Sequence, residues 1–260
     1  MISGSSNDGC WIVYDIETGC KDLEEMRFID GGFDRTAIAH PGQFDPGAIK
    51  YGRMTDPEKR EQKMAAAILK HQQALEDYEF AVSKAASDYD QQLLNDGALR
   101  AELCRVLTIG VRTSTGLTII PESDNEAEII SGFWDRLKYH LMKSQLCISF
   151  NGHNFDLPVL IRRSMILGLQ VPHCLRSNRR WWHQSLIDLR EEWRCGVYGL
   201  SKRENISLDR LSRAMGRAGK TGSGKNFSYL WQNERESAIS YLKADLVETE
   251  FAARRMGWFP

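Results

Sequence analysis

Hydrophobic and polar positions along the chain follow strand-like spacing in several separate stretches. Trp11-Ile12-Val13-Tyr14 is a run of strand-forming residues, and it leads directly into Asp15-Ile16-Glu17-Thr18-Gly19. Apolar and β-branched residues also run from Cys104 to Thr113 and from Leu117 to Ile120, and the Ser114-Thr115-Gly116 turn between them predicts a hairpin. Two further strands are predicted at Leu146–Phe150 and Trp182–Leu189.

Apolar residues recur every three to four positions in the stretches between these strands, and that spacing predicts amphipathic helices. One helix is expected at Glu126–Met142, and the last runs from about Glu234 to Arg255. Shorter helices are expected at Val159–Leu167, which ends at Gly168, and at Ser207–Met215, where the serine can cap the first turn.

The segment from Cys20 to Arg100 is a long insertion between the first two strands. Its first part holds turn signals and is expected to be mostly loop. At Thr55-Asp56-Pro57-Glu58, a capping box and a first-turn proline predict a helix, whose apolar spacing continues to Leu93 before Asn95-Asp96-Gly97 ends it. One unbroken helix would be ~60 Å long at 1.5 Å per residue, so we also consider a break or a hairpin. We expect a helical insertion at about 54–100 that serves as an arm, a surface for a protein partner or a means of self-association, rather than as a substrate lid.

With 260 residues the chain can bury one sizeable core, and we expect a single domain over 1–260 that contains this insertion. Hydrophobic residues make up 42% and charged residues 27%, as in ordinary soluble proteins, and no apolar run approaches the ~20 residues that span a bilayer. Residues 1–9 lack the blocks of a signal peptide, and the six cysteines show no metal-ligand spacing. These features predict a cytoplasmic protein with reduced thiols and no membrane partner.

The net charge of −1 gives by itself no reason to expect nucleic-acid binding, but the charges are unevenly distributed. Between Ile161 and Lys225, fourteen Lys and Arg residues stand against five Asp and Glu residues. A basic segment beside an acidic cluster is typical of a polyanionic substrate held against a metal site. Within it, the run from Arg176 to Trp182 mixes cations and aromatics as single-strand binders do, although a Trp pair at a strand start more often packs in a core.

Asp15 and Glu17 are the first candidates for chemistry. Side chains on a strand alternate between its faces, so these two carboxylates point to the same side. They repel each other unless a cation lies between them, and hard oxygen ligands suit Mg²⁺ or Mn²⁺. Alone, the pair fits an exposed edge strand with two solvated acids equally well.

Two later stretches supply matching polar residues. Asn151-Gly152-His153-Asn154-Phe155-Asp156 follows a short buried strand, and Tyr241-Leu242-Lys243-Ala244-Asp245 lies on the last helix, where its first and last residues share one face. Together with Asp15-Ile16-Glu17, these stretches resemble the three exonuclease motifs of the DEDD superfamily of 3′–5′ exonucleases, in its tyrosine subtype. The nearest likeness is to the proofreading exonuclease domain of family B DNA polymerases. The histidine subtype would need His five residues before Asp245, where this chain has Ser240.

The resemblance implies an α/β, RNase H-like fold, in which helices flank a mixed five-stranded sheet with one antiparallel strand. It also implies four metal ligands for two divalent cations, Mg²⁺ or Mn²⁺, namely Asp15, Glu17, Asp156 and Asp245. The cations would activate the attacking water and offset charge on the scissile phosphate and the leaving 3′-oxygen. Tyr241 is expected to orient that water, because tyrosine with a pKa near ~10 is a poor base at neutral pH.

A chain with these motifs and no polymerase domain after them is expected to be a free-standing exonuclease that releases nucleotides from the 3′ end of DNA or RNA. Single-stranded DNA is the expected partner. Thr18, Asn151 and Phe155 are the substrate-contact candidates within the motifs, with Asn151 near the terminal nucleotide and Phe155 as an apolar or stacking wall. His153 is interpreted as a loop residue rather than as a ligand.

The segment Gly219–Lys225 has the GxxxxGK spacing of a phosphate-binding loop. However, the next residue is Asn226, where a nucleotide-binding loop needs Ser or Thr for magnesium, and the segment follows a helix rather than a strand. We interpret it as a basic loop in which Lys220 and Lys225 contact substrate phosphates. A P-loop nucleotide hydrolase therefore ranks behind a nucleic-acid-binding module with a vestigial nuclease site. The four carboxylates and the tyrosine favour an active exonuclease over both.

Overall fold

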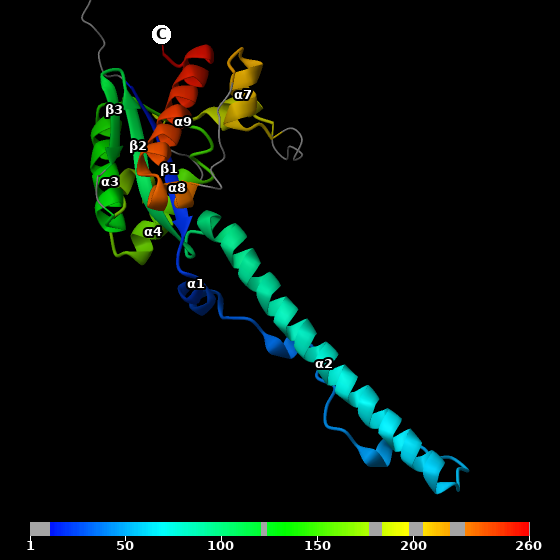
Figure 1. The fold of residues 1–260 in the computed structure, drawn as a ribbon. Coiled ribbons are helices and arrows are strands. Elements are labelled where there is room, and N and C mark those ends of the chain that lie inside the picture. The colour runs from blue at the N-terminus through cyan, green and yellow to red at the C-terminus, as the bar shows by residue number, and fades with distance from the viewer. Residues whose placement is uncertain (1–10, 121–123, 177–183, 198–204, 219–226, 260) are drawn as a thin grey trace, which may run out of the picture. The chain divides into compact units, whose positions relative to one another are not determined.

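A computed structural model describes residues 11–120, 124–176, 184–197, 205–218 and 227–259 (Figure 1). The chain forms two compact units. One consists of the chain as far as Lys21 together with the chain from Gly97 onward, and the other consists of Asp22–Asp96. Among the described residues, no helix combines the length and the apolar content that crossing a membrane requires.

The first unit is built on a five-stranded sheet with the strand order β3-β2-β1-β4-β5 (Figure 1). Its strands are β1 (Trp11–Cys20), β2 (Cys104–Thr113), β3 (Gly116–Ile120), β4 (Leu146–Ser149) and β5 (Leu186–Asp188). β2 runs antiparallel to both of its neighbours, whereas β1, β4 and β5 run parallel to one another. The predicted hairpin and the single antiparallel strand are both confirmed.

Helices cover both faces of this sheet. They are α3 (Glu126–Met142), α4 (Asp156–Ile166), α5 (His173–Arg176), α6 (Leu189–Arg194), α7 (Leu208–Ala214), α8 (Phe227–Asn233) and α9 (Arg235–Arg255), and a 3₁₀ turn, η3, lies at Gly97–Leu99. One core contains buried residues of α3 and α4, and a second core contains residues of α7, α8 and α9. A mixed sheet with helices on both faces is the expected RNase H-like architecture.

β1 lies at the centre of the sheet and contributes to both cores. Ile12, Tyr14 and Ile16 belong to the core beside α3, whereas Trp11 and Val13 belong to the core beside α9. A strand that is buried on both faces needs apolar residues at successive positions, which explains the unbroken apolar run at its start.

The second unit contains α1 (Leu23–Asp30), two 3₁₀ turns (Arg35–Ala37 and Pro46–Ala48) and α2 (Pro57–Asp96). The expectation that the stretch after Gly19 is mostly loop is wrong at α1, which Arg27 ties to α2 through its bonds to Asp90. The idea of a break or a hairpin in the long helix is also wrong. α2 continues for 40 residues, because after Pro57 its sequence contains neither Gly nor Pro and is rich in strong helix formers.

Two further boundaries differ from the predictions. α4 begins at Asp156, three residues earlier than expected. The strand expected over Trp182–Leu189 begins outside the described residues, and within them β5 forms its Leu186–Asp188 part. It ends one residue earlier than expected, because the side chain of Asp188 caps the next helix and Leu189 already belongs to that helix.

Candidate active site

The carboxyl ends of β1, β4 and β5 lie at one edge of the sheet. The register pairs Val13 with Ile148 and Ser149 with Asp188, so the residues that follow these positions on the three strands lie close together. The chain order also changes direction here, since β2 and β3 lie on one side of β1 and the later strands on the other. In open α/β sheets, ligands usually bind in the crevice outside the carboxyl ends of the strands, at the point where the strand order changes direction in this way.

Three of the predicted ligands gather at this edge. Asp15 and Glu17 from β1 and Asp245 from α9 each offer a carboxylate oxygen, and these oxygens all lie within 4.8 Å of one another. Asp245 is only 6% exposed, and the two strand acids are half-buried. The expected common face of Asp15 and Glu17 is confirmed. Three carboxylates this close repel one another, so the donor set fits a hard divalent cation.

Asp156 is held beside the same strand. Its Oδ1 accepts a hydrogen bond from the main-chain N–H of Ile16 at 3.1 Å. The parallel pairing of β1 with β4 ends at Val13 and Ile148, so at Ile16 this carboxylate occupies the place of a strand partner. Burial raises the pKa of Asp156 to about 7; the N–H of Ile16 opposes this shift, and the charge of Asp188 adds to it. Asp156 is not part of the cluster that Asp15, Glu17 and Asp245 form.

Tyr241 lies one helical turn before Asp245 on the buried side of α9. The two residues are 9% and 6% exposed, so their expected common helix face is confirmed. The ring of Tyr241 packs at a tilt against the ring of Phe227 on α8, with 5.9 Å between the ring centroids. This packing fixes the ring on the helix face that also carries a clustered carboxylate.

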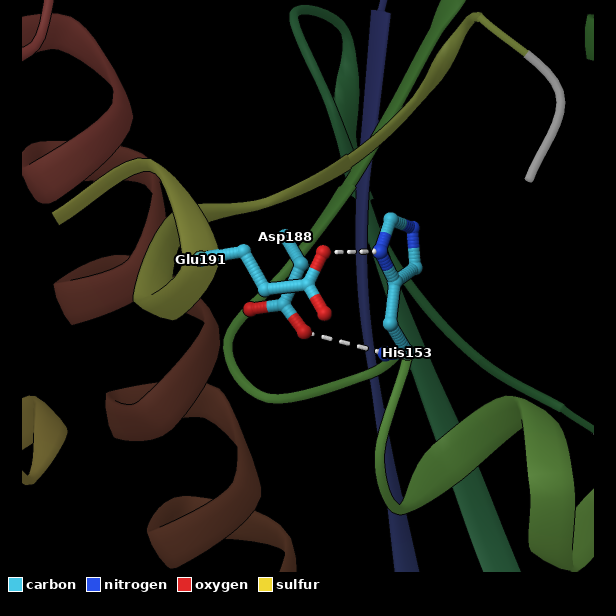
Figure 2. Close-up of side chains that lie close together, drawn as sticks. All are labelled: His153, Asp188 and Glu191. Atoms are coloured by element: carbon cyan, nitrogen blue, oxygen red, sulfur yellow. Dashed lines mark hydrogen bonds and ion pairs between the residues drawn. The ribbon is translucent and has the colours of Figure 1, made fainter. Parts of the chain in front are cut away.

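The loop between β4 and α4 is held by Asp188. Its Oδ1 accepts the main-chain N–H groups of Asn151 at 2.8 Å and of Arg190 at 2.9 Å. Its Oδ2 accepts the N–H of His153 at 3.0 Å, the lower dashed line in Figure 2. Asn151 has a φ of 68°, a left-handed conformation that Asn tolerates better than most residues. Asp188 therefore fixes the backbone from which Asn151 and Asp156 extend.

His153 adds an outer contact to the same loop. Its Nδ1 lies 2.7 Å from Oε2 of Glu191, the upper dashed line in Figure 2. His153, Asp188 and Glu191 are close enough to hold a metal ion. However, the carboxylate of Asp188 already accepts three main-chain N–H groups, so we interpret the cluster as a clamp on the loop.

A cavity of about 380 Å³ opens at the site and is lined by Asp15, Asn151, Arg190 and Asp245, among others. Its volume lies in the usual range of ligand pockets. The expected contact residue Asn151 therefore faces the same cavity as two of the clustered acids.

The other expected contact residues have structural partners or lie outside the described residues. Phe155 is half-buried and packs against the core beside α3. The hydroxyl of Thr18 donates to the carbonyl oxygen of Ala98 at 2.7 Å. Lys220 and Lys225 lie outside the described residues, as does most of the predicted Arg176–Trp182 run.

The sequence interpretation missed two residues of this site. Asp188 could have been recognised from the sequence, because an Asp that ends a strand and precedes a helix is a favoured N-cap. No sequence pattern indicates a role for Arg190, since it is one of many arginines in a basic segment.

Comparisons with known proteins identify a family and a similar fold. Residues 97–256 match a family described as a predicted 3′–5′ exonuclease related to the exonuclease domain of PolB. The fold is similar to the solved structure of the family B DNA polymerase from the hyperthermophilic archaeon Pyrobaculum calidifontis, with a TM-score of 0.50 and 17% identity. That likeness covers 95% of this chain but 24% of the polymerase chain. Among curated proteins, no match was found.

Proposed function

The chain belongs to the family of predicted 3′–5′ exonucleases related to the exonuclease domain of PolB, and from this we propose that it is a metal-dependent exonuclease that releases nucleotides from the 3′ end of single-stranded DNA. The gathering of three carboxylates within 4.8 Å, from β1 and α9, is the observation that carries the metal-dependent part of the proposal. The family match begins at residue 97 and so leaves out β1. Asp15 and Glu17 nevertheless belong to the same compact unit as Asp245.

The four acids divide into two kinds of ligand. Asp15, Glu17 and Asp245 would hold the cations directly, because their oxygens already lie together. Asp156 would join them as the fourth ligand once it is ionised, since it is bonded to the strand residue between Asp15 and Glu17. Two bound Mg²⁺ or Mn²⁺ ions would supply Lewis acidity to activate water and to stabilise negative charge on the phosphate.

The remaining residues position the reactants. Tyr241 orients the attacking water by a hydrogen bond from the buried face of α9. Asn151 contacts the terminal nucleotide from the cavity wall. The roles of Thr18 and Phe155 as substrate contacts stay predictions, because both side chains already have structural partners.

The proposal is tested by digesting 5′-labelled oligonucleotides of DNA and RNA, single- and double-stranded, with Mg²⁺, Mn²⁺ or EDTA. We expect a ladder that shortens from the 3′ end of single-stranded DNA, that requires the metal and that Asp245→Asn abolishes. Binding of these strands without hydrolysis under any metal would instead indicate a module with a vestigial site.

The role of Tyr241 has its own test. Tyr241→Phe keeps the packing against Phe227 and loses one hydrogen bond, so we expect kcat to fall by about 10², which is ~3 kcal/mol in the barrier. Asp245→Asn removes a charged ligand one helical turn away and should cost far more. If both variants were equally inactive in single-turnover digestion, Tyr241 would take part in proton transfer, and its assignment as a positioning residue would be wrong.

A further inference from the structure

Arg190 is a cation in the candidate site for which the proposed chemistry gives no role. It is the second residue of α6 and lines the cavity that also contains Asp15 and Asp245. Its main-chain N–H donates to Asp188, the carboxylate that also holds the N–H of Asn151. The backbone of Arg190 is therefore fixed to the same support as the motif loop.

Among the described residues, the guanidinium of Arg190 is held at one nitrogen. Its Nη1 donates to Oδ1 of Asn151 at 2.7 Å. Its Nε is buried and makes no hydrogen bond with the described residues. Within the described part of the chain, Arg190 also forms no ion pair. A guanidinium has five N–H donors and no acceptor, so most of its donors lack a protein partner here.

Arg163 shows how this chain treats a buried arginine that has a purely structural role. Its Nη2 lies 2.6 Å from Oε2 of Glu126, and its Nη1 donates to the carbonyl oxygen of Ala101. Buried charges are normally paired and hydrogen-bonded in this way. At Arg190, burial and the charge of Arg194 lower the pKa, and the nearby Asp188 only partly opposes them. Arg190 is half-buried and has no carboxylate partner of this kind among the described residues, so its remaining N–H groups can bind an additional anion.

The chemistry of that anion follows from the donors. A guanidinium braced by an amide presents a planar set of N–H groups, which fits the oxygens of a phosphate better than a sugar or a neutral base. We propose that Arg190, braced by Asn151, binds one backbone phosphate of the nucleic-acid strand beside the metal-binding carboxylates. This inference rests on the proposed function and adds the residue that holds the strand.

The test uses single-stranded DNA in which one of the last three linkages is a neutral methylphosphonate. Affinities are measured by fluorescence anisotropy in the Asp245→Asn background, so that the strand is not degraded. Neutralising the contacted phosphate should weaken binding about tenfold when Arg190 is present. Arg190→Ala should weaken binding of the unmodified strand by a similar factor and should no longer distinguish that methylphosphonate. Arg190→Lys should be intermediate, because it keeps the charge and loses the planar fork.

Arg162→Ala is the matched control, since Arg162 is an exposed cation on α4 outside the cavity, and it should leave every affinity unchanged. If Arg190→Ala kept the full methylphosphonate penalty at each linkage, Arg190 would act only by supporting Asn151, and the inference would be overturned. That outcome leaves the exonuclease proposal intact, provided that the natural chain hydrolyses the unmodified strand. A natural chain that neither binds nor hydrolyses any strand would overturn both proposals.

Discussion

At the scale of single residues, Asp188 shapes the site without lining its cavity. It is 2% exposed, and its two oxygens accept three main-chain N–H groups, two from the loop between β4 and α4 and one from the first turn of α6. An ionised carboxylate only accepts hydrogen bonds, so all three contacts are favourable at once. The cost of moving this charge into the interior is offset by charge-assisted hydrogen bonds.

Asp188→Asn tests this clamp. The amide keeps one oxygen for two of the N–H groups, but its NH₂ group meets the third donor, so we expect a loss of about 1–3 kcal/mol in the free energy of unfolding. Urea denaturation of the metal-free protein measures it. Glu191→Gln is the control, because its exposed side chain keeps an oxygen that can accept a hydrogen bond from His153, and it should change stability by less than about 0.5 kcal/mol. Equal effects of the two variants would show that Asp188 is not the main support of the loop.

The raised pKa of Asp156 predicts how stability depends on pH when no metal is added. Its pKa is about 7 in the folded chain and near ~3.9 when the chain is unfolded. Between these values the folded state holds a proton that the unfolded state has released. The contribution of protonated Asp156 to the free energy of unfolding is therefore fully present below about pH 4 and is lost as the pH rises through 7.

Asp156→Asn removes this contribution, so the difference in unfolding free energy between the variant and the natural chain should shift in favour of the variant from pH 4 to pH 8. The expected shift is on the order of a few kcal/mol. Denaturation series in EDTA at several pH values measure it. A difference that does not change with pH would contradict the buried, protonated state of Asp156.

Much of the acidic site could be predicted from the sequence because it depends on local periodicity. A period of two places Asp15 and Glu17 on one face, and a spacing of four places Tyr241 and Asp245 on one helix face. Which strands lie side by side is not a local property. Arg190 becomes informative only after folding has placed it in the cavity that Asp15 and Asn151 also line, and no sequence pattern around Arg190 indicates these neighbours.

At the scale of elements, the predicted helices and strands agree best with the structure where an element is long and its apolar residues recur regularly. The predicted Glu126–Met142 helix is confirmed at both ends, because an Asn cap precedes a long amphipathic repeat. The short helices α6 and α8 were not predicted, since six or seven residues hold too few repeats to show a period. α7 is as short, but its Ser207 cap marks where it begins. β5 is also short, and its existence depends on pairing with β4 rather than on its own composition.

The turn that joins β4 to α4 depends on a glycine. A Cβ at Gly152 would lie 2.0 Å from Oγ of Ser149 and 3.3 Å from the hydroxyl of Tyr14. Gly152→Ala should therefore destabilise the fold by about 1–3 kcal/mol through overpacking, and should lower activity by displacing the loop. Thermal unfolding and digestion rates measure the two effects.

The double variant Ser149→Ala with Gly152→Ala tests whether this contact causes the destabilisation. It removes the nearest atom, so its destabilisation should be smaller than the sum of the two single changes. If the losses in unfolding free energy of the two single variants simply added up in the double variant, contact between residues 149 and 152 would not be the cause of the destabilisation.

At the scale of the whole molecule, the chain inserts a separate compact unit between two adjacent strands of its sheet. The ends of that insertion are held by contacts within the first unit. Cys20 pairs with Cys104 in the β1–β2 ladder, and the N–H of Lys21 donates to Leu103 at 2.9 Å. The clustered acids, the clamp and the cavity all belong to the first unit. A role of α2 in binding a protein partner or a second copy stays a prediction.

This division predicts that residues 22–96 can be replaced by a flexible linker of about six Gly and Ser residues. The shortened chain should keep one cooperative unfolding transition and a metal-dependent 3′–5′ ladder on short single strands, because β1 and β2 would still pair as a hairpin. Its helical signal in far-ultraviolet circular dichroism should fall, since α1 and α2 are removed. Asp245→Asn in the shortened chain is the control and should abolish the ladder. A shortened chain that folds cooperatively and binds DNA but no longer hydrolyses it would show that the insertion takes part in catalysis, and the assignment of the whole active site to the first unit would be wrong.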